Sequence, residues 1–151
     1  MLGMIGALML VLSGACAGEA AASSLTAKER QLAELELLLQ KTEVYLSGEL
    51  LGTNEIYERL ASLDNSYSQA FCSDDPVGYL RHSELAGAAE LADYLKNFGH
   101  TDLQGQLAQN ALLLAEISDK HSVALAKCSR QCKLRRVMGL SAGLIAAIIL
   151  I

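Results

Sequence analysis

The hydrophobic residues of this chain are most concentrated at its two ends. Residues 1–18 (MLGMIGALMLVLSGACAG) and residues 137–151 (VMGLSAGLIAAIILI) contain no Asp, Glu, Lys, Arg or His. As a helix, the C-terminal run of 15 residues would cover about 22 Å, whereas the hydrocarbon core of a bilayer is about 30 Å thick. We therefore expect a C-terminal transmembrane helix that is completed by the aliphatic stems of the Lys and Arg side chains before it. The alternative for so short a run is a buried core helix of a soluble protein.

The N-terminal run, residues 1–18, allows three interpretations. No Lys or Arg precedes it, although secretory signal peptides usually carry one there, so a transmembrane helix is the favoured prediction. The second is a lipoprotein signal, because the segment SGAC ending at Cys16 is similar to the small-residue box before a lipidated cysteine. The third is a cleaved signal peptide. Each apolar run also contains a glycine pair at the spacing that lets two helices approach closely: Gly14 and Gly18, and Gly139 and Gly143.

Between the two ends, apolar residues recur at helical spacing. Residues 19–30 are rich in Ala and Ser and are interpreted as a linker. Residues 31–46 predict an amphipathic helix whose inner stripe recurs every three or four residues: Leu32, Leu35, Leu39, Thr42 and Leu46. Shorter helices are predicted after the candidate caps Thr53 and Ser83, and at Pro76, because Pro at the first helical position loses no hydrogen bond. No alternating strand pattern is present, so we predict an all-α fold, a small helical bundle.

The turn before the last helix carries the clearest local signal. Gly99 is predicted to end the preceding helix in a left-handed conformation. Thr101 and Gln104 have the spacing of a capping box, in which the threonine hydroxyl accepts from the Gln104 amide and that side chain reaches back. The helix that follows can run unbroken into the C-terminal apolar run. Its predicted inner stripe consists of Leu103, Leu107, Ala111, Leu114, Ile117, His121, Leu125, Cys128 and Cys132.

Charge is distributed unevenly along the chain. The net charge is −5, but residues 127–136 contain five basic residues and no acidic one, which leaves residues 1–126 with a net charge of −10. Such an acidic body would repel nucleic acid, so no nucleic-acid partner is expected. Because Lys28 and Arg30 follow the first apolar run and the basic cluster precedes the second, the positive-inside rule places the middle of the chain in the cytoplasm.

Candidate chemical sites are few. His121, Cys128 and Cys132 share one predicted helical face, but His121 lies about 10 Å along the helix from Cys128, and no second cysteine pair could close a zinc site. We therefore interpret them as part of a buried stripe, and we expect all four cysteines to be reduced. No phosphate-binding loop, dinucleotide fingerprint or metalloprotease motif is present, so no cofactor, no metal and no enzymatic activity are predicted. The acidic residues around Glu34 and Glu36 predict a solvated face, with a docking surface for a basic partner as the alternative.

The pattern also resembles a known family along most of the chain. The residues that carry this likeness are the Arg30-Gln31-Leu32…Leu35…Leu39…Glu43-Val44-Tyr45 helix, Thr53…Leu60-Ala61, Phe98-Gly99-x-Thr101-Asp102-x-x-x-Gln106, and Arg135-x-x-x-Gly139-x-x-x-Gly143. On these residues the chain resembles stage III sporulation protein AB of endospore-forming bacteria. The resemblance implies a membrane component of the secretion-like channel complex between mother cell and forespore, similar to the type II secretion system F protein. It also implies a cytoplasmic ATPase as partner.

From these patterns we expect a scaffold with four segments. They are a transmembrane helix or signal-like segment at 1–18, a linker at 19–30, a cytoplasmic bundle at 31–136, and a transmembrane helix at 137–151. The protein would lie in the mother-cell membrane with its body facing the cytoplasm, in contact with other channel proteins; self-association is left open. The residues expected to set structure and topology are Gly99, Thr101, Asp102, Gln106, Lys133, Arg135, Arg136, Gly139 and Gly143. The alternatives are an extracytoplasmic helical protein lipidated at Cys16 and a metal-dependent enzyme.

Overall fold

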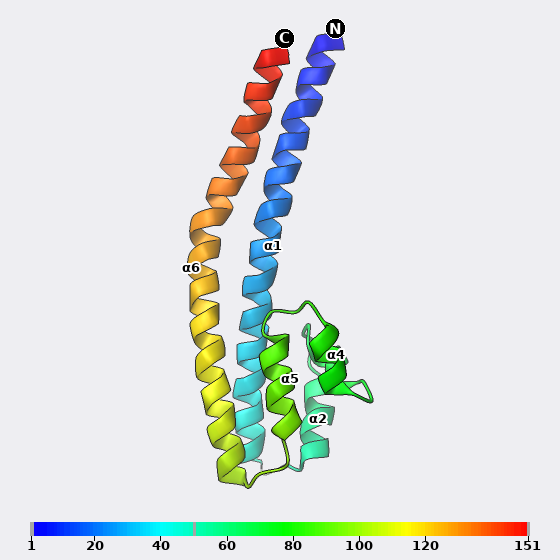
Figure 1. Ribbon diagram of the computed structural model, residues 1–151, viewed down its shortest axis with the longest axis vertical. Helices are drawn as coiled ribbons and strands as arrows, with labels where there is room; N and C mark the ends of the chain where they lie inside the picture. Colours follow the sequence, from blue (N-terminus) through cyan, green and yellow to red (C-terminus); the bar gives the residue numbers. More distant parts are fainter. Residues whose placement is uncertain (1, 50, 151) are drawn as a thin grey trace. The chain divides into compact units, whose positions relative to one another are not determined.

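All regular structure in the described residues is helical, as the sequence predicts. The computed structural model describes the backbone of residues 2–49 and 51–150. These residues form helices α1 (Leu2–Ser47), α2 (Thr53–Ala61), α3 (Ser68–Phe71), α4 (Pro76–His82), α5 (Ala88–Asn97) and α6 (Leu103–Leu150) (Figure 1). Within the terminal helices, the side chains left undescribed are those of residues 2–5, 7, 8, 10, 21, 136, 140, 143, 144, 146, 147, 149 and 150.

The chain divides into two compact units. The terminal unit consists of Met1–Glu29 and Val123–Ile151, and the central unit consists of Arg30–Ser122. Both boundaries fall inside the long helices α1 and α6, so neither unit is separated from the other by a loop. Residues 19–30, which we predicted as a linker, are therefore helical throughout. Their Ala-rich composition explains the difference, because alanine is the strongest helix former and the serines can bond back to the helix, as Ser23 does to the Ala20 carbonyl (2.9 Å).

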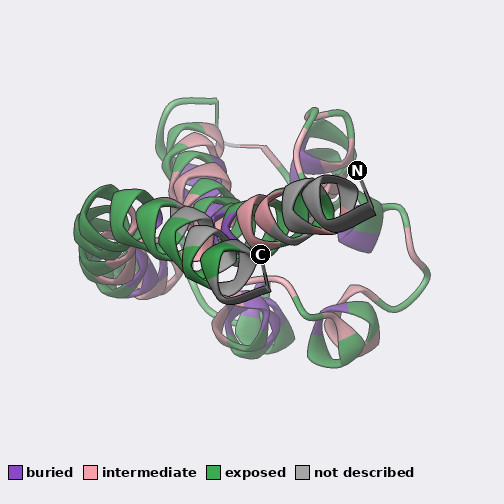
Figure 2. Ribbon diagram, turned by 90° about the horizontal axis from the view of Figure 1, so that it is seen from above, coloured by how far each residue is buried: buried purple, intermediate pink, exposed green. Residues whose placement is uncertain are grey.

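The core of the central unit is built on the predicted stripe of α1. Leu32, Leu35, Leu39, Thr42 and Leu46 are all buried, with no more than 7% of any side chain exposed. Leu38 joins them, and the short helices contribute Ile56, Leu60, Leu80, Leu91 and Leu95. Buried segments of the chain are purple in Figure 2. The only polar member of the stripe is Thr42, which satisfies its hydroxyl by donating to the Leu38 carbonyl at 2.9 Å. Hydrophobic periodicity thus identified the face of α1 that holds the unit together.

The short helices begin close to the predicted positions, with two exceptions. Pro76 starts α4 as expected, and the Asp75 side chain accepts from the Gly78 amide at 2.9 Å. Thr53 is already helical and Gly52 is the N-cap of α2. The prediction that Ser83 caps the next helix is wrong: Ser83 is extended and ends α4, and α5 begins after Gly87, whose φ is +80°. Gly87 could not be recognised from the sequence as the start of a helix, because a left-handed glycine usually ends one.

The cap of α6 is displaced by one residue from the predicted capping box. The N-cap is Asp102, whose carboxylate accepts from the Gly105 amide at 3.1 Å, and its carbonyl accepts the first helical bond from Gln106 at 2.9 Å. Residue N3 is thus a glycine, which has no side chain to reach back, so the predicted box between Thr101 and Gln104 does not form. Asp and Thr are both good caps, and their adjacency made the sequence ambiguous.

The buried stripe of α6 differs from the predicted one in its first half. Ile117 is buried as expected, but its neighbours on the stripe are Leu113 and Asn110, whereas Leu103 and Leu125 are 41% and 52% exposed. Asn110 is fully buried, and its amide nitrogen donates to the Leu39 carbonyl at 3.1 Å. A hydrophobicity pattern assigns asparagine to the surface, which explains why the predicted stripe of α6 does not match the buried one.

The two predicted transmembrane helices are not confirmed. In the residues that the structure describes, no helix reaches the length and hydrophobicity of a membrane span. The apolar runs at both ends are nevertheless helical, within α1 and α6 respectively.

Candidate interaction surfaces

In the terminal unit, α1 and α6 approach each other closely at glycines. A Cβ atom added to Gly139 would lie 2.6 Å from the carbonyl oxygen of Gly14 and 2.8 Å from the Cα of Gly18. Both neighbours are backbone atoms, so no side-chain movement can make room. The close approach that the glycine spacing suggests is seen at these three residues. Gly143 has a helical backbone and lies among the residues whose surroundings are not described.

A pair of thiols lies beside this crossing in the terminal unit. The sulfur atoms of Cys128 and Cys132, one turn apart on α6, are 3.1 Å apart, and Thr26 Oγ1 of α1 lies 3.5 Å and 3.8 Å from them. The Cys132 thiol also donates to the Ala22 carbonyl at 3.6 Å. Among the described residues, no group of three His, Cys, Asp or Glu side chains could hold a metal ion. The contacts with Thr26 and Ala22 pack these thiols against α1; Cys132 is buried, as the stripe interpretation predicts, whereas Cys128 is half-buried.

Basic side chains follow the thiols along α6. Lys127, Arg130, Lys133 and Arg135 are all exposed, and the side chain of Arg136 is not described. Lys127 and Arg130 also line a shallow hollow on this helix together with Val123. The basic segment that we predicted from the sequence thus presents its charges to the surroundings of the terminal unit.

The predicted structural residues around Gly99 do meet in one turn of the central unit. Gly99 is left-handed, with φ of +82°, and an added Cβ would lie 3.0 Å from Thr53 Oγ1. Gln106 donates from Nε2 to the Thr101 carbonyl at 2.9 Å, while Thr101 itself is exposed. Together with the Asp102 cap, these contacts hold the turn between α5 and α6.

The position of the cap gives a prediction on stability. Asp102→Ala should destabilise the protein by about 1 kcal/mol, because the Gly105 amide loses its acceptor, whereas Thr101→Ala should cost much less, because only its backbone carbonyl is used. Urea unfolding of the full-length protein in detergent, followed by circular dichroism, measures both. Equal losses for the two variants would restore the predicted capping box.

The acidic face of α1 is engaged in internal contacts. Glu34 Oε2 accepts from the amide and hydroxyl of Ser66 at 2.9 Å and 2.7 Å, and Glu34 Oε1 accepts from Arg30 at 2.9 Å. Burial opposes ionisation of Glu34, but these hydrogen bonds outweigh it and hold the pKa of the carboxyl below its usual value. Glu36 lies 2.7 Å from Nδ1 of His121. Both carboxylates therefore serve the fold, which weakens the alternative that they form a docking surface.

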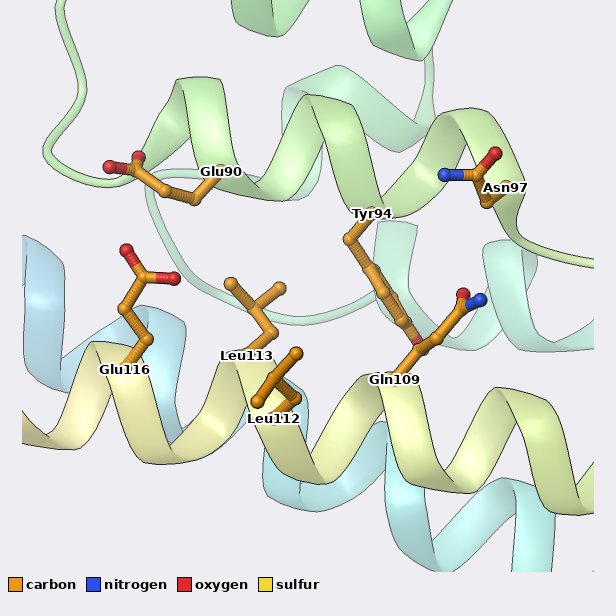
Figure 3. A pocket seen from close by; sticks show the side chains of 7 residues that line it. All are labelled: Glu90, Tyr94, Asn97, Gln109, Leu112, Leu113 and Glu116. Atoms are coloured by element: carbon orange, nitrogen blue, oxygen red, sulfur yellow. The ribbon is translucent and has the colours of Figure 1, made fainter.

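A cleft between α5 and α6 is a surface that sequence analysis missed. It has a volume of about 320 Å³ and is lined by Glu90, Tyr94, Asn97, Gln109, Leu112, Leu113 and Glu116. Figure 3 shows the two glutamates at one end, Asn97 and Gln109 at the other, and the leucines between them. Leu112 is 75% exposed, and it lies off the stripe that we predicted for α6. Leu113 beneath is buried, so the floor of the cleft is apolar.

Lys120 sets the charge at the glutamate end of this cleft. Its Nζ lies 2.5 Å from Glu90 Oε1 and 2.7 Å from Glu116 Oε1. The hydrogen bond from Lys120 outweighs partial burial and keeps the pKa of Glu90 below its usual value, while Glu116 first and then Glu90 raise the pKa of Lys120. One lysine thus faces two carboxylates, and the formal charges of the three side chains sum to one negative charge.

These paired carboxylates predict an acid-sensitive fold. Glu34 and Glu90 have lowered pKa values when folded, so their stabilising contribution is complete above the ordinary value of 4.5 and is lost as the pH falls through the folded-state pKa. Unfolding in urea at pH 7 and near pH 3 should therefore show a smaller loss of stability in Glu34→Gln and Glu90→Gln than in the wild type. Glu43→Gln, on the exposed side of α1, is the control, and it should lose as much as the wild type.

Comparison with known proteins relates part of these surfaces to a family. Residues 81–151 match the family model of stage III sporulation protein AB. The matched region contains α5, the Gly99 turn, the α5–α6 cleft and the whole of α6. No curated protein and no solved structure matches the chain significantly.

Proposed function

Because residues 81–151 match the family model of stage III sporulation protein AB, we propose that the chain is a membrane-embedded scaffold of the channel complex between mother cell and forespore. In this proposal the terminal unit is inserted in the mother-cell membrane. The central unit lies in the cytoplasm and docks an ATPase and other channel proteins. The role is structural and not catalytic.

Exposed apolar side chains on the terminal unit are the observation that carries the membrane part of the proposal. Large hydrophobic side chains on both helices are between 54% and 71% exposed: Met9, Leu12, Val137, Met138, Ile145 and Ile148. In water, so many exposed apolar groups would be a liability, whereas lipid tails would cover them at no cost. The close approach at Gly139 supports the same environment, because helices in membranes pack through small residues.

The distribution of charge supports the orientation. The basic segment on α6 follows the central unit and precedes the apolar run, which is where Lys and Arg gather on the cytoplasmic side of a membrane. Each such residue near an anionic surface contributes about 1 kcal/mol of attraction. The central unit carries six basic and fifteen acidic residues, a net charge of −9, so it would remain in solution beside the membrane and favour a basic partner surface.

Thiol labelling tests the topology. With the four native cysteines replaced by serine, a single cysteine at Ser62 or Asp119, both exposed, should react with a membrane-impermeant maleimide only after the cells are opened. A cysteine at Met9 or Ile148 should react poorly in both conditions, because lipid would surround it. Labelling of Ser62→Cys in intact cells would contradict the cytoplasmic placement.

Two further measurements separate this proposal from the lipid-anchored alternative. Intact mass spectrometry of the protein from sporulating cells should show Cys16 without an acyl group. The membrane fraction should contain the protein in the wild type and lose it when Lys133 and Arg135 are both changed to Glu. A mature chain that begins at an acylated Cys16 would overturn the scaffold with two membrane helices.

A further inference from the structure

The α5–α6 cleft contains a buried hydroxyl group that the central unit does not use. Tyr94 is only 8% exposed, and among the described residues its hydroxyl group has no hydrogen-bond partner. Its ring points from α5 toward α6 (Figure 3) and packs against Phe98 at a centroid distance of 5.4 Å. Burial raises the pKa of this hydroxyl, so it stays protonated and can donate. An unused donor of this kind is costly, because a buried polar group without a partner loses its hydration.

The rest of the cleft offers what a protein segment would need. Leu112 presents most of its side chain to solvent beside the buried Leu113, so an apolar side chain placed there would complete a hydrophobic contact. Gln109 and Asn97, at the Tyr94 end, carry amide groups, which can both donate hydrogen bonds to a peptide backbone and accept them from it. At the other end, one Lys faces two carboxylates, which leaves room for a second cation.

We propose that this cleft is the docking site for a segment of the partner protein that carries a large apolar side chain next to a Lys or Arg. The apolar side chain covers Leu112, a backbone carbonyl of the segment accepts from Tyr94, and the cation pairs with Glu116. A second copy of the chain is disfavoured as occupant, because two central units with net charges of −9 repel each other. This inference rests on the docking role proposed above and assigns the docking to a specific site on the central unit.

Photocrosslinking in sporulating cells tests the site against a matched position. A benzophenone amino acid replaces Leu112 in one strain and Leu37, which is 54% exposed on α1 of the same unit, in another. We expect a crosslink to a different protein from position 112 and none from position 37, with the attached peptide, identified by mass spectrometry, containing a basic residue next to an apolar one. Crosslinking between two copies from position 112 would overturn the inference.

The controls distinguish the cleft from the docking role itself. A crosslink to another protein from position 37 alone would show that docking occurs on a different face, so the cleft would be wrong and the proposed function would stand. The absence of a crosslink from both positions would contradict both proposals.

A substitution that spares the fold gives the second readout. Tyr94→Phe removes a hydroxyl without a partner, so the melting temperature of the purified protein should be unchanged or higher, while recovery of the crosslinked partner at position 112 should fall about fivefold. Leu112→Ser should leave the melting temperature unchanged and reduce co-purification of the same partner about tenfold. Unchanged partner recovery in Tyr94→Phe would exclude the hydroxyl, and unchanged co-purification in Leu112→Ser would exclude the cleft.

Discussion

Gly87→Val should destabilise the central unit by about 2–5 kcal/mol, which is the largest loss that we expect from a single substitution in this unit. Two independent effects add. Gly87 has a φ of +80°, a conformation that a β-branched residue strongly resists. An added Cβ would also lie 2.6 Å from Leu35 Cδ2 and 3.2 Å from Ile117 Cδ1. Leu35 and Ile117 are both fully buried, so neither side chain can swing into solvent to make room.

Gly99→Val is the matched control, because it changes the same residue type at almost the same φ. Gly99 is exposed, and the nearest atom to an added Cβ is Oγ1 of Thr53, a short, half-buried side chain at the start of α2. It should therefore show the backbone cost without most of the packing cost, and be less destabilising than Gly87→Val by about 1–3 kcal/mol. Urea unfolding of the full-length protein in detergent measures both variants. Equal losses would mean that the contact of Gly87 with α1 is not restrictive.

Two asparagine variants separate the backbone cost from the packing cost. Asn tolerates the left-handed conformation better than valine does, so Gly99→Asn should be close to the wild type. Gly87→Asn should remain destabilising, because the clash with Leu35 stays.

The comparison of Gly87 with the α1 stripe shows which features the sequence could predict. The buried leucines of α1 were predictable because each is apolar and their spacing repeats over four turns. A single polar residue within such a long repeat does not obscure the helical period. The start of α5 was not predictable, because the need for glycine at position 87 arises from contacts with Leu35 and Ile117, which are distant in sequence. The one-residue shift of the α6 cap has a local cause, since Thr101 and Asp102 are both competent caps.

The candidate functional surfaces also differ in whether the sequence could predict them. The glycine spacing and the basic segment are local patterns, and the structure places Gly139 against Gly14 and Gly18 as that spacing suggests. The α5–α6 cleft is formed by residues of two helices, and the face that α6 buries includes Asn110, which donates to the Leu39 carbonyl of α1 and which a hydrophobicity pattern assigns to the surface. Likewise, the pairing of Glu34 with Ser66 joins residues 32 positions apart, and no sequence spacing announces it.

Gly139→Leu should separate α1 from α6 in the terminal unit. The added side chain would meet the Gly14 carbonyl and the Gly18 Cα at less than 3 Å, and the helices can relieve such a clash only by moving apart. The cost of overpacking is about 1–3 kcal/mol, enough to lower the population of the close arrangement about tenfold. Ser141→Leu is the control, because residue 141 is exposed on the same helix and adds a similar volume.

The separation can be measured with a thiol pair engineered at two positions that the structure places close together. In full-length protein with Cys16, Cys72 and Cys128 replaced by serine, Ala22→Cys would stand opposite native Cys132, whose sulfur lies 3.6 Å from the Ala22 carbonyl oxygen. Oxidation in membranes should join the two residues readily in this background and in Ser141→Leu, and about tenfold more slowly in Gly139→Leu. Under the proposed function, in which α1 and α6 pack together in the membrane, Gly139→Leu should reduce sporulation, while Ser141→Leu should not. Rapid oxidation in Gly139→Leu would show that the glycine crossing does not hold the helices together.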